Sequence, residues 1–440
     1  HGSKLACRVT LKTALYPVSA AYRIEAAGFC QGRGTAGLVF ALHTAIETAI
    51  VAHLDIYVLY VDLSKCFMSF DRQCGAWSEM WYGLPQEAQK ALFGIYRDVT
   101  GRFETAFGST SPFDILRGFI QGALESPERC KGMMNSLIEL IGLKVVGFQW
   151  FSPGGGGGEE VLILVFADDA ANCVSSFDQL ERAAVFWEIW SIITGVGINI
   201  SGMKKTVWSG AIWRRDTPTS PLTQRNAPGK LFIRRVKVPK MSIFDFYKYL
   251  GWLTSLDGKQ CQATVKKLID KQHVHNSRVG SREHSRSLAI TTANCHTYGN
   301  GFYYGATVGG SLAFIEQVLG PVQRRVIRAR GVAGKRRSLD SCRLNLHAEA
   351  NAKYSEHVVN DDLRHTLAVK HSAAAGVTGY NLVHWYPPLA AASASCFFNA
   401  IAATTPVPER AAALSAYTML MWDLGCREKP MTWQFKDHLH

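Results

Sequence analysis

The clearest pattern in the chain is a pair of apolar runs that each lead to aspartate. Residues 56–61 lead directly to Asp62, and residues 161–166 lead to the adjacent Asp168 and Asp169. Short uninterrupted apolar runs of this kind predict buried strands. Adjacent carboxylates at the end of a buried strand are costly unless a cation neutralises them. If one sheet pairs the two strands, Asp62 and Asp168 meet at one edge as hard-oxygen ligands for two Mg²⁺ ions.

Apolar residues at helical spacing surround these strands. One face of the segment that begins at Thr35 is apolar as far as Ile50, which predicts a helix of about four turns leading into the first strand. A second helix is predicted over residues 78–98 and a third over residues 133–143, with a short strand at residues 102–107 between them.

A capping signal predicts the helix that follows the paired aspartates. Ser176 and Gln179 fit a capping box, and the apolar spacing continues to near Gly195. The glycine run at residues 154–158 lacks the Gly-Lys-Ser/Thr ending of a phosphate-binding loop, so we interpret it as a flexible connection. Strand-rich sequence then continues to Gly251.

The charge is concentrated in one part of an otherwise ordinary composition. The 440 residues are 47% hydrophobic and 19% charged, which is typical of a globular chain with two or three domains. Of the net charge of +13, residues 201–340 contribute 25 Lys and Arg against 7 Asp and Glu, a local balance of +18 that leaves −5 for the remainder. This stretch predicts a nucleic-acid interface, with a solvated basic surface as the alternative.

Cysteine spacing and hydropathy bear on location. The 11 cysteines include no Cys-x-x-Cys pair and no histidine at zinc-finger spacing, so we interpret them as reduced thiols of an intracellular protein. No run of 18 apolar residues and no secretory pattern is present, which argues against a membrane span or export.

Five motifs follow one another in an order that is found in a known family. They are Asp62, the segment 118–122 with Ser126 and Pro127, the pair Asp168 and Asp169, Lys205 with Thr206, and Tyr249 with Leu250 and Gly251. This order resembles the palm of reverse transcriptases, and most of all that of non-LTR (LINE-like) retrotransposons. The resemblance covers about residues 22–260 and includes an upstream segment, residues 27–35, which is similar to a stretch that precedes the palm in those elements.

The resemblance implies an α+β fold with a right-hand polymerase palm, in which an antiparallel sheet packs on helices, together with partial fingers and a helical thumb. The expected domains are partial fingers at residues 1–54, a palm with the catalytic carboxylates at residues 55–260, a basic helical thumb at residues 261–340, and a carboxyl-terminal segment of unknown role at residues 341–440. Because the chain starts at His1 and reaches the palm so soon, we expect a fragment that lacks complete fingers.

The family's chemistry implies roles for the three aspartates. In a two-metal mechanism one ion lowers the pKa of the primer 3′-hydroxyl and the other holds the triphosphate. The implied cofactor is Mg²⁺, as two ions, with Mn²⁺ as the alternative. Asp62 and Asp168 are the expected ligands and catalytic residues, and Asp169 completes the triad in a weaker role. The plainer interpretation makes Asp62 a strand-end residue and the pair a hairpin turn.

Phe67 lies five residues after Asp62, where reverse transcriptases carry an aromatic residue that excludes the ribose 2′-hydroxyl. The resemblance therefore implies selection of deoxynucleotides, because viral RNA-copying RNA polymerases place a polar group at this position. The alternative is that Phe67 only packs in the core. Lys65 and Arg33 are candidates for contacts with nucleotide phosphates.

The segment before the third predicted helix is the candidate nucleotide pocket. Gln121 and Gly122 resemble residues that lie beneath the template base and the incoming nucleotide, where a missing Cβ lets the backbone approach the ligand. The chain departs from the family at Glu125, where an apolar residue is usual, and at Arg129 and Cys130, where Leu-Phe is common.

Two later motifs complete the candidate site. Lys205 is the candidate for protonating or stabilising the pyrophosphate, with Lys204 as a competitor and a solvated surface lysine as the alternative. Tyr249, Leu250 and Gly251 resemble the primer-grip turn, with an ordinary hairpin as the alternative.

The basic stretch supplies the expected nucleic-acid contacts. Arg324, Arg325 and Arg328 in the thumb are the named candidates, and residues 234–237 form a further basic cluster. The expected function is that of an RNA-directed DNA polymerase of a retrotransposon, with an RNA template, a DNA primer and dNTPs as partners and the nucleus as its site of action. The alternatives are a catalytically inactive retroelement remnant that only binds nucleic acid, and a group II intron-type reverse transcriptase or maturase.

Overall fold

The computed structural model describes one of two compact units of the chain. The described residues are 2–30, 33–150, 159–200, 205–259 and 408–423, with isolated positions between 263 and 274. One unit comprises His1–Gly258 with Ala400–His440, and the other comprises Lys259–Asn399. Nearly all of the second unit, and with it the predicted thumb helices, lies outside the described residues.

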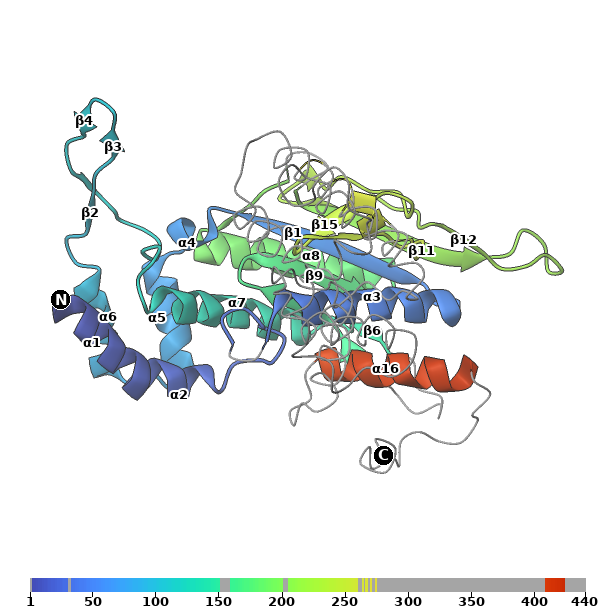
Figure 1. The fold of residues 1–440 in the computed structure, drawn as a ribbon, viewed down its shortest axis with the longest axis horizontal. Helices are drawn as coiled ribbons and strands as arrows, with labels where there is room; N and C mark the ends of the chain where they lie inside the picture. Colours follow the sequence, from blue (N-terminus) through green and yellow to red (C-terminus); the bar gives the residue numbers. More distant parts are fainter. Residues whose placement is uncertain are drawn as a thin grey trace, which may run out of the picture. The chain divides into compact units, whose positions relative to one another are not determined.

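A six-stranded antiparallel sheet forms the centre of the first unit (Figure 1). Its strands run in the order β12 (Thr223–Asn226), β11 (Val207–Arg214), β1 (Ile56–Ser64), β9 (Asp169–Val174) and β8 (Ile163–Phe166), and β10 (Gly197–Ile198) pairs with the end of β1. The two predicted apolar strands are therefore β1 and β8, but β9 lies between them. Strand β9 was not among the predicted strands, because its small residues, Ala-Ala-Asn-Cys, give little hydrophobic signal although all of them are buried.

Helices cover one face of the sheet, and a hairpin covers the other. The main apolar core lies between the sheet and the helices α7 (Ser126–Gly142) and α8 (Phe177–Thr194). On the opposite face, the hairpin of β15 (Tyr247–Tyr249) and β16 (Trp252–Thr254) packs on β1, where the Tyr60 hydroxyl lies 3.0 Å from Thr254 Oγ1. The mixed helix and antiparallel sheet agrees with the predicted α+β class.

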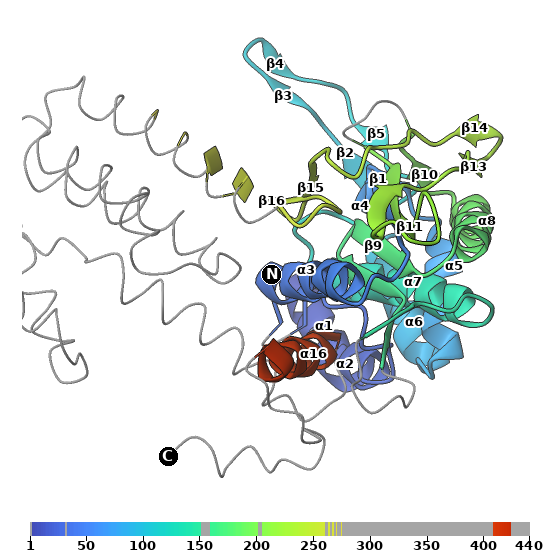
Figure 2. The same cartoon turned by 90° about the vertical axis from the view of Figure 1, so that its right-hand side faces the viewer.

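Helix α3 (Thr35–Val51) matches the predicted four-turn helix, and its N-cap is Gly34 rather than Thr35. Helix α16 (Pro408–Asp423) lies alongside it (Figure 2), and Thr48 Oγ1 lies 3.3 Å from Ser415 Oγ. The sequence from the far end of the described chain thus packs on the helix that leads into β1.

The helix predicted over residues 78–98 is two helices, α5 (Arg72–Trp81) and α6 (Gln86–Ile95). Gly83 adopts a left-handed φ of 93°, and Pro85 is the N-cap of α6, so the chain breaks between them. The strand predicted at residues 102–107 is replaced by an arm of short paired strands, which are β2 (Thr100–Gly101), β3 (Glu104–Thr105), β4 (Gly108–Ser109) and β5 (Phe113–Asp114). At the amino-terminal end, α1 (Gly2–Thr10), the π-helix Leu11–Leu15 and α2 (Tyr16–Ser19) pack against α6.

Only one of the two hydrogen bonds of the predicted capping box of α8 is present. The Ser176 side chain accepts a hydrogen bond from the Gln179 backbone N–H, at 3.3 Å. The Gln179 side chain does not reach back to Ser176, because its Oε1 accepts from the Val146 N–H at 2.8 Å. Gly195 ends the helix with a φ of 75°, as the sequence predicted.

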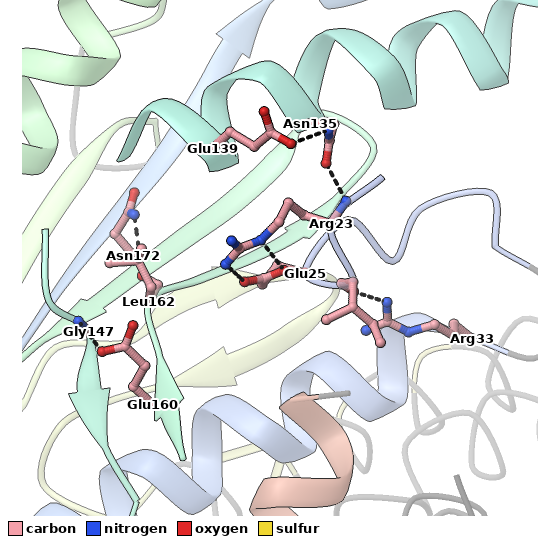
Figure 3. Close-up of polar contacts among 10 residues, drawn as sticks. Arg23, Glu25, Arg33, Asn135, Glu139, Gly147, Glu160, Leu162 and Asn172 are labelled. Carbon is pink, nitrogen blue, oxygen red and sulfur yellow. Dashed lines mark hydrogen bonds and ion pairs between the residues drawn. The ribbon is translucent and has the colours of Figure 1, made fainter. Parts of the chain in front are cut away.

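The segment that precedes α3, residues 23–27, forms hydrogen bonds with the edge strand β8 and with helix α7 (Figure 3). The Arg23 N–H donates to Asn135 Oδ1 on α7, and the Arg23 guanidinium pairs with Glu25 at 2.7 Å. The Ala27 N–H then donates to the Val165 carbonyl of β8 at 2.9 Å. Asn172 makes two side-chain hydrogen bonds next to this edge. Its Nδ2 donates to the Leu162 carbonyl at 3.3 Å. Its Oδ1 accepts from the Trp187 indole N–H at 2.6 Å.

Several smaller ribbons flank the sheet. They are β6 (Phe148–Gln149) with β7 (Glu160–Val161), and β13 (Phe232–Ile233) with β14 (Val236–Lys237). Among the described residues, no helix is long and apolar enough to span a membrane.

Candidate active site

Sheet register brings the carboxylates together at the end of β1. Asp62 is directly opposite Asp169, the first residue of β9. Directly opposed residues of an antiparallel pair share one face, so these two side chains lie side by side. Asp168 lies in the two-residue turn that joins β8 to β9, since Phe166 pairs with Asp169. The expectation that Asp62 faces Asp168 is therefore refined, because Asp169 is the cross-strand neighbour.

This turn is held in an unusual conformation. Ala167 has a φ of 57°, a left-handed value that residues with a Cβ rarely adopt. Gly28 packs against the turn, and a Cβ added to Gly28 would lie 2.4 Å from Ala167 N. The upstream motif therefore needs glycine at this position so that its backbone can approach the aspartate hairpin.

The three carboxylates carry more negative charge than their surroundings neutralise. Burial by the surrounding protein, together with Asp168 and Asp62, raises the pKa of Asp169 to about 6, although its side chain keeps an exposed surface. Lys248 and Lys205 oppose this rise. Lys248, on β15, was not anticipated, because its place beside the carboxylates depends on how the β15–β16 hairpin packs on the sheet.

Lys205 lies beside Asp62, and its predicted role at the pyrophosphate stays a prediction. Its Nζ lies 3.4 Å from Asp62 Oδ2, and both side chains are partly exposed. The backbone around Asp62 is fixed by the two ends of the segment that carries Lys205. The Asn199 N–H donates to the Asp62 carbonyl at 2.9 Å, the Thr206 N–H donates to the Asn199 carbonyl, and the Asp62 N–H donates to Thr206 Oγ1 at 3.1 Å. Lys204 lies outside the described residues.

The site suits a divalent cation in chemistry but not in its present geometry. Carboxylate oxygens are the preferred ligands of Mg²⁺, and the raised pKa of Asp169 reflects burial first and then neighbouring negative charge, both of which a cation would offset. Within the described part of the chain, however, no three His, Cys, Asp or Glu side chains lie close enough together to hold a metal ion. Metal binding would therefore require these carboxylates to turn toward one another.

Phe67 lies on α4 (Cys66–Ser69), immediately after β1. Its partly buried ring meets Phe29 edge-to-face, with 6.1 Å between ring centroids, and packs against the main core. Lys65 begins this helix with a φ of 48° and an exposed side chain. The structure thus places Phe67 and Lys65 next to the carboxylate edge, and it shows core contacts for Phe67 as well.

The Gln121 and Gly122 segment is tied to the same helix. The Gly118 N–H donates to the Phe70 carbonyl at 2.9 Å, and a Cβ on Gly118 would lie 2.5 Å from Met68 backbone atoms. Gln121 and Gly122 are exposed, and Gly122 has a φ of 85° with open space around its Cα. The segment therefore presents a free backbone surface beside Phe67.

Arg72 holds this segment in place, a role that sequence analysis missed. Its Nε donates to the Gly118 carbonyl at 2.8 Å, and its Nη2 donates to the Ile115 carbonyl at 2.9 Å. The guanidinium also lies over the Tyr96 ring, 4.7 Å from its centroid. No local pattern reveals these contacts, because they join residues more than 40 positions apart in the sequence.

Glu125 and Arg129, two polar residues where an apolar one was expected, each have a polar partner in the fold. Arg129 Nε lies 2.6 Å from Glu79 Oε1, and both side chains are 1% exposed. The Tyr96 hydroxyl donates to Glu125 Oε1 at 2.9 Å. Glu79 on α5 and the Tyr96 hydroxyl thus supply matching polar groups for Arg129 and Glu125.

The predicted primer-grip residues form a tight hairpin turn. Leu250 and Gly251 have φ values of 48° and 96° and join β15 to β16. The buried Tyr249 donates its hydroxyl to the Leu164 carbonyl of β8 at 3.0 Å, which anchors the hairpin to the sheet. The hairpin is thus present, and its role in holding a primer stays a prediction.

Arg33 has partners other than the predicted phosphate. Its guanidinium bonds the Ile24 carbonyl and pairs with Glu409 of α16, with Nη2 2.8 Å from Glu409 Oε2. A phosphate contact would require this pair to open. Arg324, Arg325 and Arg328 lie outside the described residues, as does the glycine run at residues 154–158.

Comparison with known proteins gives only a distant likeness. No protein-family model matches the chain, and no curated protein matches it. The structure of Candida tropicalis telomerase in complex with a fragment of telomeric RNA has 10% identity over 94% of this chain and 56% of that chain, with a TM-score of 0.39. Candida albicans telomerase in complex with a fragment of telomeric RNA has 11% identity over 80% of this chain and 55% of that chain, with a TM-score of 0.32.

This chain therefore spans little more than half the length of those telomerase chains. At such TM-scores the likeness carries no argument about the detailed fold or the function.

Proposed function

We propose that this chain is an RNA-directed DNA polymerase, a reverse transcriptase of the retrotransposon kind, which adds deoxynucleotides to a primer on an RNA template. The observation that carries the proposal is the pairing of β1 with β9, which sets Asp62 opposite Asp169 with Asp168 in the adjoining turn. The ordered sequence motifs lead to the same function independently of this geometry.

Each surrounding residue has a task in this reaction. Asp62, Asp169 and Asp168 would bind Mg²⁺, which when bound supplies the positive charge that activates the 3′-hydroxyl and holds the triphosphate. The Lys205 ammonium, 3.4 Å from Asp62, would face the departing pyrophosphate and offset its charge. Phe67 would exclude a 2′-hydroxyl, while Gly122 leaves the backbone open to the nucleotide.

One observation favours a second candidate, a chain that binds nucleic acid without catalysis. Asp62 is paired with Lys205, and no metal-binding group of three side chains exists among the described residues. An inactive remnant of a polymerase would keep the fold but would not position its carboxylates to bind metal ions.

Primer extension on a primed RNA template with Mg²⁺ separates the two candidates. The polymerase proposal predicts extension with dNTPs that stops when the metal is chelated. An Asp62→Asn, Asp169→Asn double variant is the control, since it keeps the shape of both side chains. If the unaltered chain binds the primed template but never extends it, with Mg²⁺ or with Mn²⁺, the non-catalytic candidate is correct.

A further inference from the structure

The hairpin of β13 and β14 presents cations that the rest of the described structure does not neutralise. Arg234 and Arg235 form its two-residue turn, and Lys237 lies on the second strand. All three residues are exposed, and in the residues that the structure describes their side chains make no hydrogen bond or ion pair. The tip therefore concentrates positive charge in solvent.

Exposed arginines on the neighbouring strands are different. Arg214 on β11 pairs with Asp55 at 3.0 Å, and Arg225 on β12 pairs with Asp216. The hairpin contacts one acidic side chain of α8, Glu188, whose Oε2 accepts from the Arg234 backbone N–H at 2.7 Å. Glu188 thus anchors the turn without pairing its guanidiniums.

The backbone of the turn is costly for these residues. Arg234 and Arg235 have φ values of 51° and 60°, the left-handed region in which Asn and Gly are preferred for two-residue hairpins. Two arginines at such positions oppose the local preference of the chain. Unfavourable backbone conformations of this kind persist only where the surrounding structure imposes them, and they cluster at binding and catalytic sites.

The two faces of the hairpin differ. Ile233 is fully buried against the main core, so its face points into the molecule. Phe232 is directly opposite Lys237 and shares the other face with it, and the Phe232 side chain is 50% exposed. Figure 2 shows β13 and β14 beside α8. The outer face thus combines an aromatic ring and an ammonium beside two guanidiniums.

We propose that this hairpin, residues 232–237, is a contact site for single-stranded nucleic acid. A base stacks on Phe232, and Arg234, Arg235 and Lys237 bind the adjoining phosphates. An exposed aromatic ring can stack on a base only where the base is unpaired, and a cluster of cations follows the backbone of the strand. The proposal goes beyond the polymerase reaction, because it needs no catalytic residue.

The first test separates binding from folding. Arg234→Asn with Arg235→Gly removes both cations and installs the residues that the turn prefers, so the variant should be at least as stable as the unaltered chain. Fluorescence anisotropy with single strands of about 16 nucleotides, one of DNA and one of RNA, gives affinity as a function of salt. Each lost phosphate contact should flatten the log–log salt slope by about 0.7. A matched Lys90→Gln, Lys144→Gln variant removes two exposed charges elsewhere and should leave the affinity and slope unchanged.

The second test isolates the stacking. Phe232→Ala should weaken single-strand binding by roughly fivefold or more without changing the salt slope. It should leave binding to a blunt duplex unchanged. Equal losses on the duplex would overturn the single-strand assignment, and unchanged affinity and slope in both hairpin variants would overturn the site. Single-strand binding is measured without dNTPs or Mg²⁺, whereas the polymerase proposal is tested by primer extension, so failure of the polymerase proposal is distinguishable from failure of this one.

Discussion

The carboxylates at the end of β1 and the ion pair between α5 and α7 deal with charge in opposite ways. Glu79 and Arg129 are both 1% exposed and lie 2.6 Å apart, so each buried charge meets its opposite. Asp62, Asp168 and Asp169 instead lie at one edge of the sheet, and burial, together with the other two carboxylates, raises the pKa of Asp169. Folding alone gains nothing from adjacent like charges. The buried pair thus balances its own charge within the fold, whereas the carboxylate edge carries negative charge that a bound cation would offset.

The largest expected effect concerns activity at the carboxylate edge. Asp62→Asn or Asp169→Asn should reduce primer extension by at least about a thousandfold, because lost metal-mediated charge stabilisation amounts to several kcal/mol and each 1.4 kcal/mol is tenfold. The melting temperature should stay the same or rise, because the substitution removes repulsion. Extension assays and thermal melts check both points, with Glu181→Gln on α8 as the control. A large loss of stability in Asp169→Asn would break the comparison.

The second prediction concerns stability at the buried pair. Arg129→Leu leaves the Glu79 carboxylate buried without its partner and should lower the free energy of unfolding by about 3–5 kcal/mol. The double variant Glu79→Leu, Arg129→Leu should recover most of this loss, because both charges are then absent. Urea titration measures the effect. If the single and double variants are equally unstable, the site depends on packing rather than on charge balance.

The third prediction follows from the pKa of Asp169. A carboxyl whose pKa is raised from 3.8 to about 6 contributes stability below pH 3.8 that is lost as the pH rises through about 6. In chelator, the unaltered chain should therefore lose stability relative to Asp169→Asn across this interval. Solvent screening keeps the amplitude small, since the side chain is exposed. Adding Mg²⁺ at pH 7 should reverse the loss, and a pH-independent difference between the two proteins would contradict the assignment.

Sequence patterns predicted the local structure around the site better than its contacts. Strand β1, helix α3 and the Ser176 and Gly195 boundaries of α8 follow from apolar spacing and caps. Strand β9 did not, because small buried residues carry little hydrophobic signal. The break between α5 and α6 follows from Gly83 and Pro85, and the prediction of one helix over residues 78–98 did not include it.

The structure brings the predicted aspartates and Lys205 near one another, and their catalytic roles stay predictions. Lys248 and Arg72 were missed because they reach their partners through tertiary packing. Arg33 was assigned to phosphate, and the structure gives it Glu409 as a partner. Glu409 lies 376 positions away, beyond the range of any local pattern.

The fourth prediction tests whether Phe67 belongs to the catalytic edge or to the core. Phe67→Ala should raise ribonucleotide use by roughly tenfold or more relative to deoxynucleotides, because the steric conflict with the 2′-hydroxyl disappears. Its effect on primer binding should be small. Matched single-nucleotide incorporation measures the ratio, and Phe29→Ala is the control, since it removes the edge-to-face neighbour of the ring. Unchanged discrimination with lowered stability would assign Phe67 to core packing.

The smallest expected effect is at Thr206. This residue is fully buried, like the ion pair of Glu79 and Arg129, yet its hydroxyl contacts Asp62 at the carboxylate edge. Thr206→Val keeps the shape of the side chain but leaves the Asp62 N–H without its acceptor, a loss of about 1 kcal/mol, so extension should fall roughly fivefold. Thr206→Ser keeps the hydroxyl and should restore most of the rate. Because Thr206 adjoins Lys205, the valine variant should also change the pH dependence of extension, which a purely structural defect would leave unaltered. Equal rates and pH profiles for the serine and valine variants would show that the hydroxyl has no part in placing Asp62.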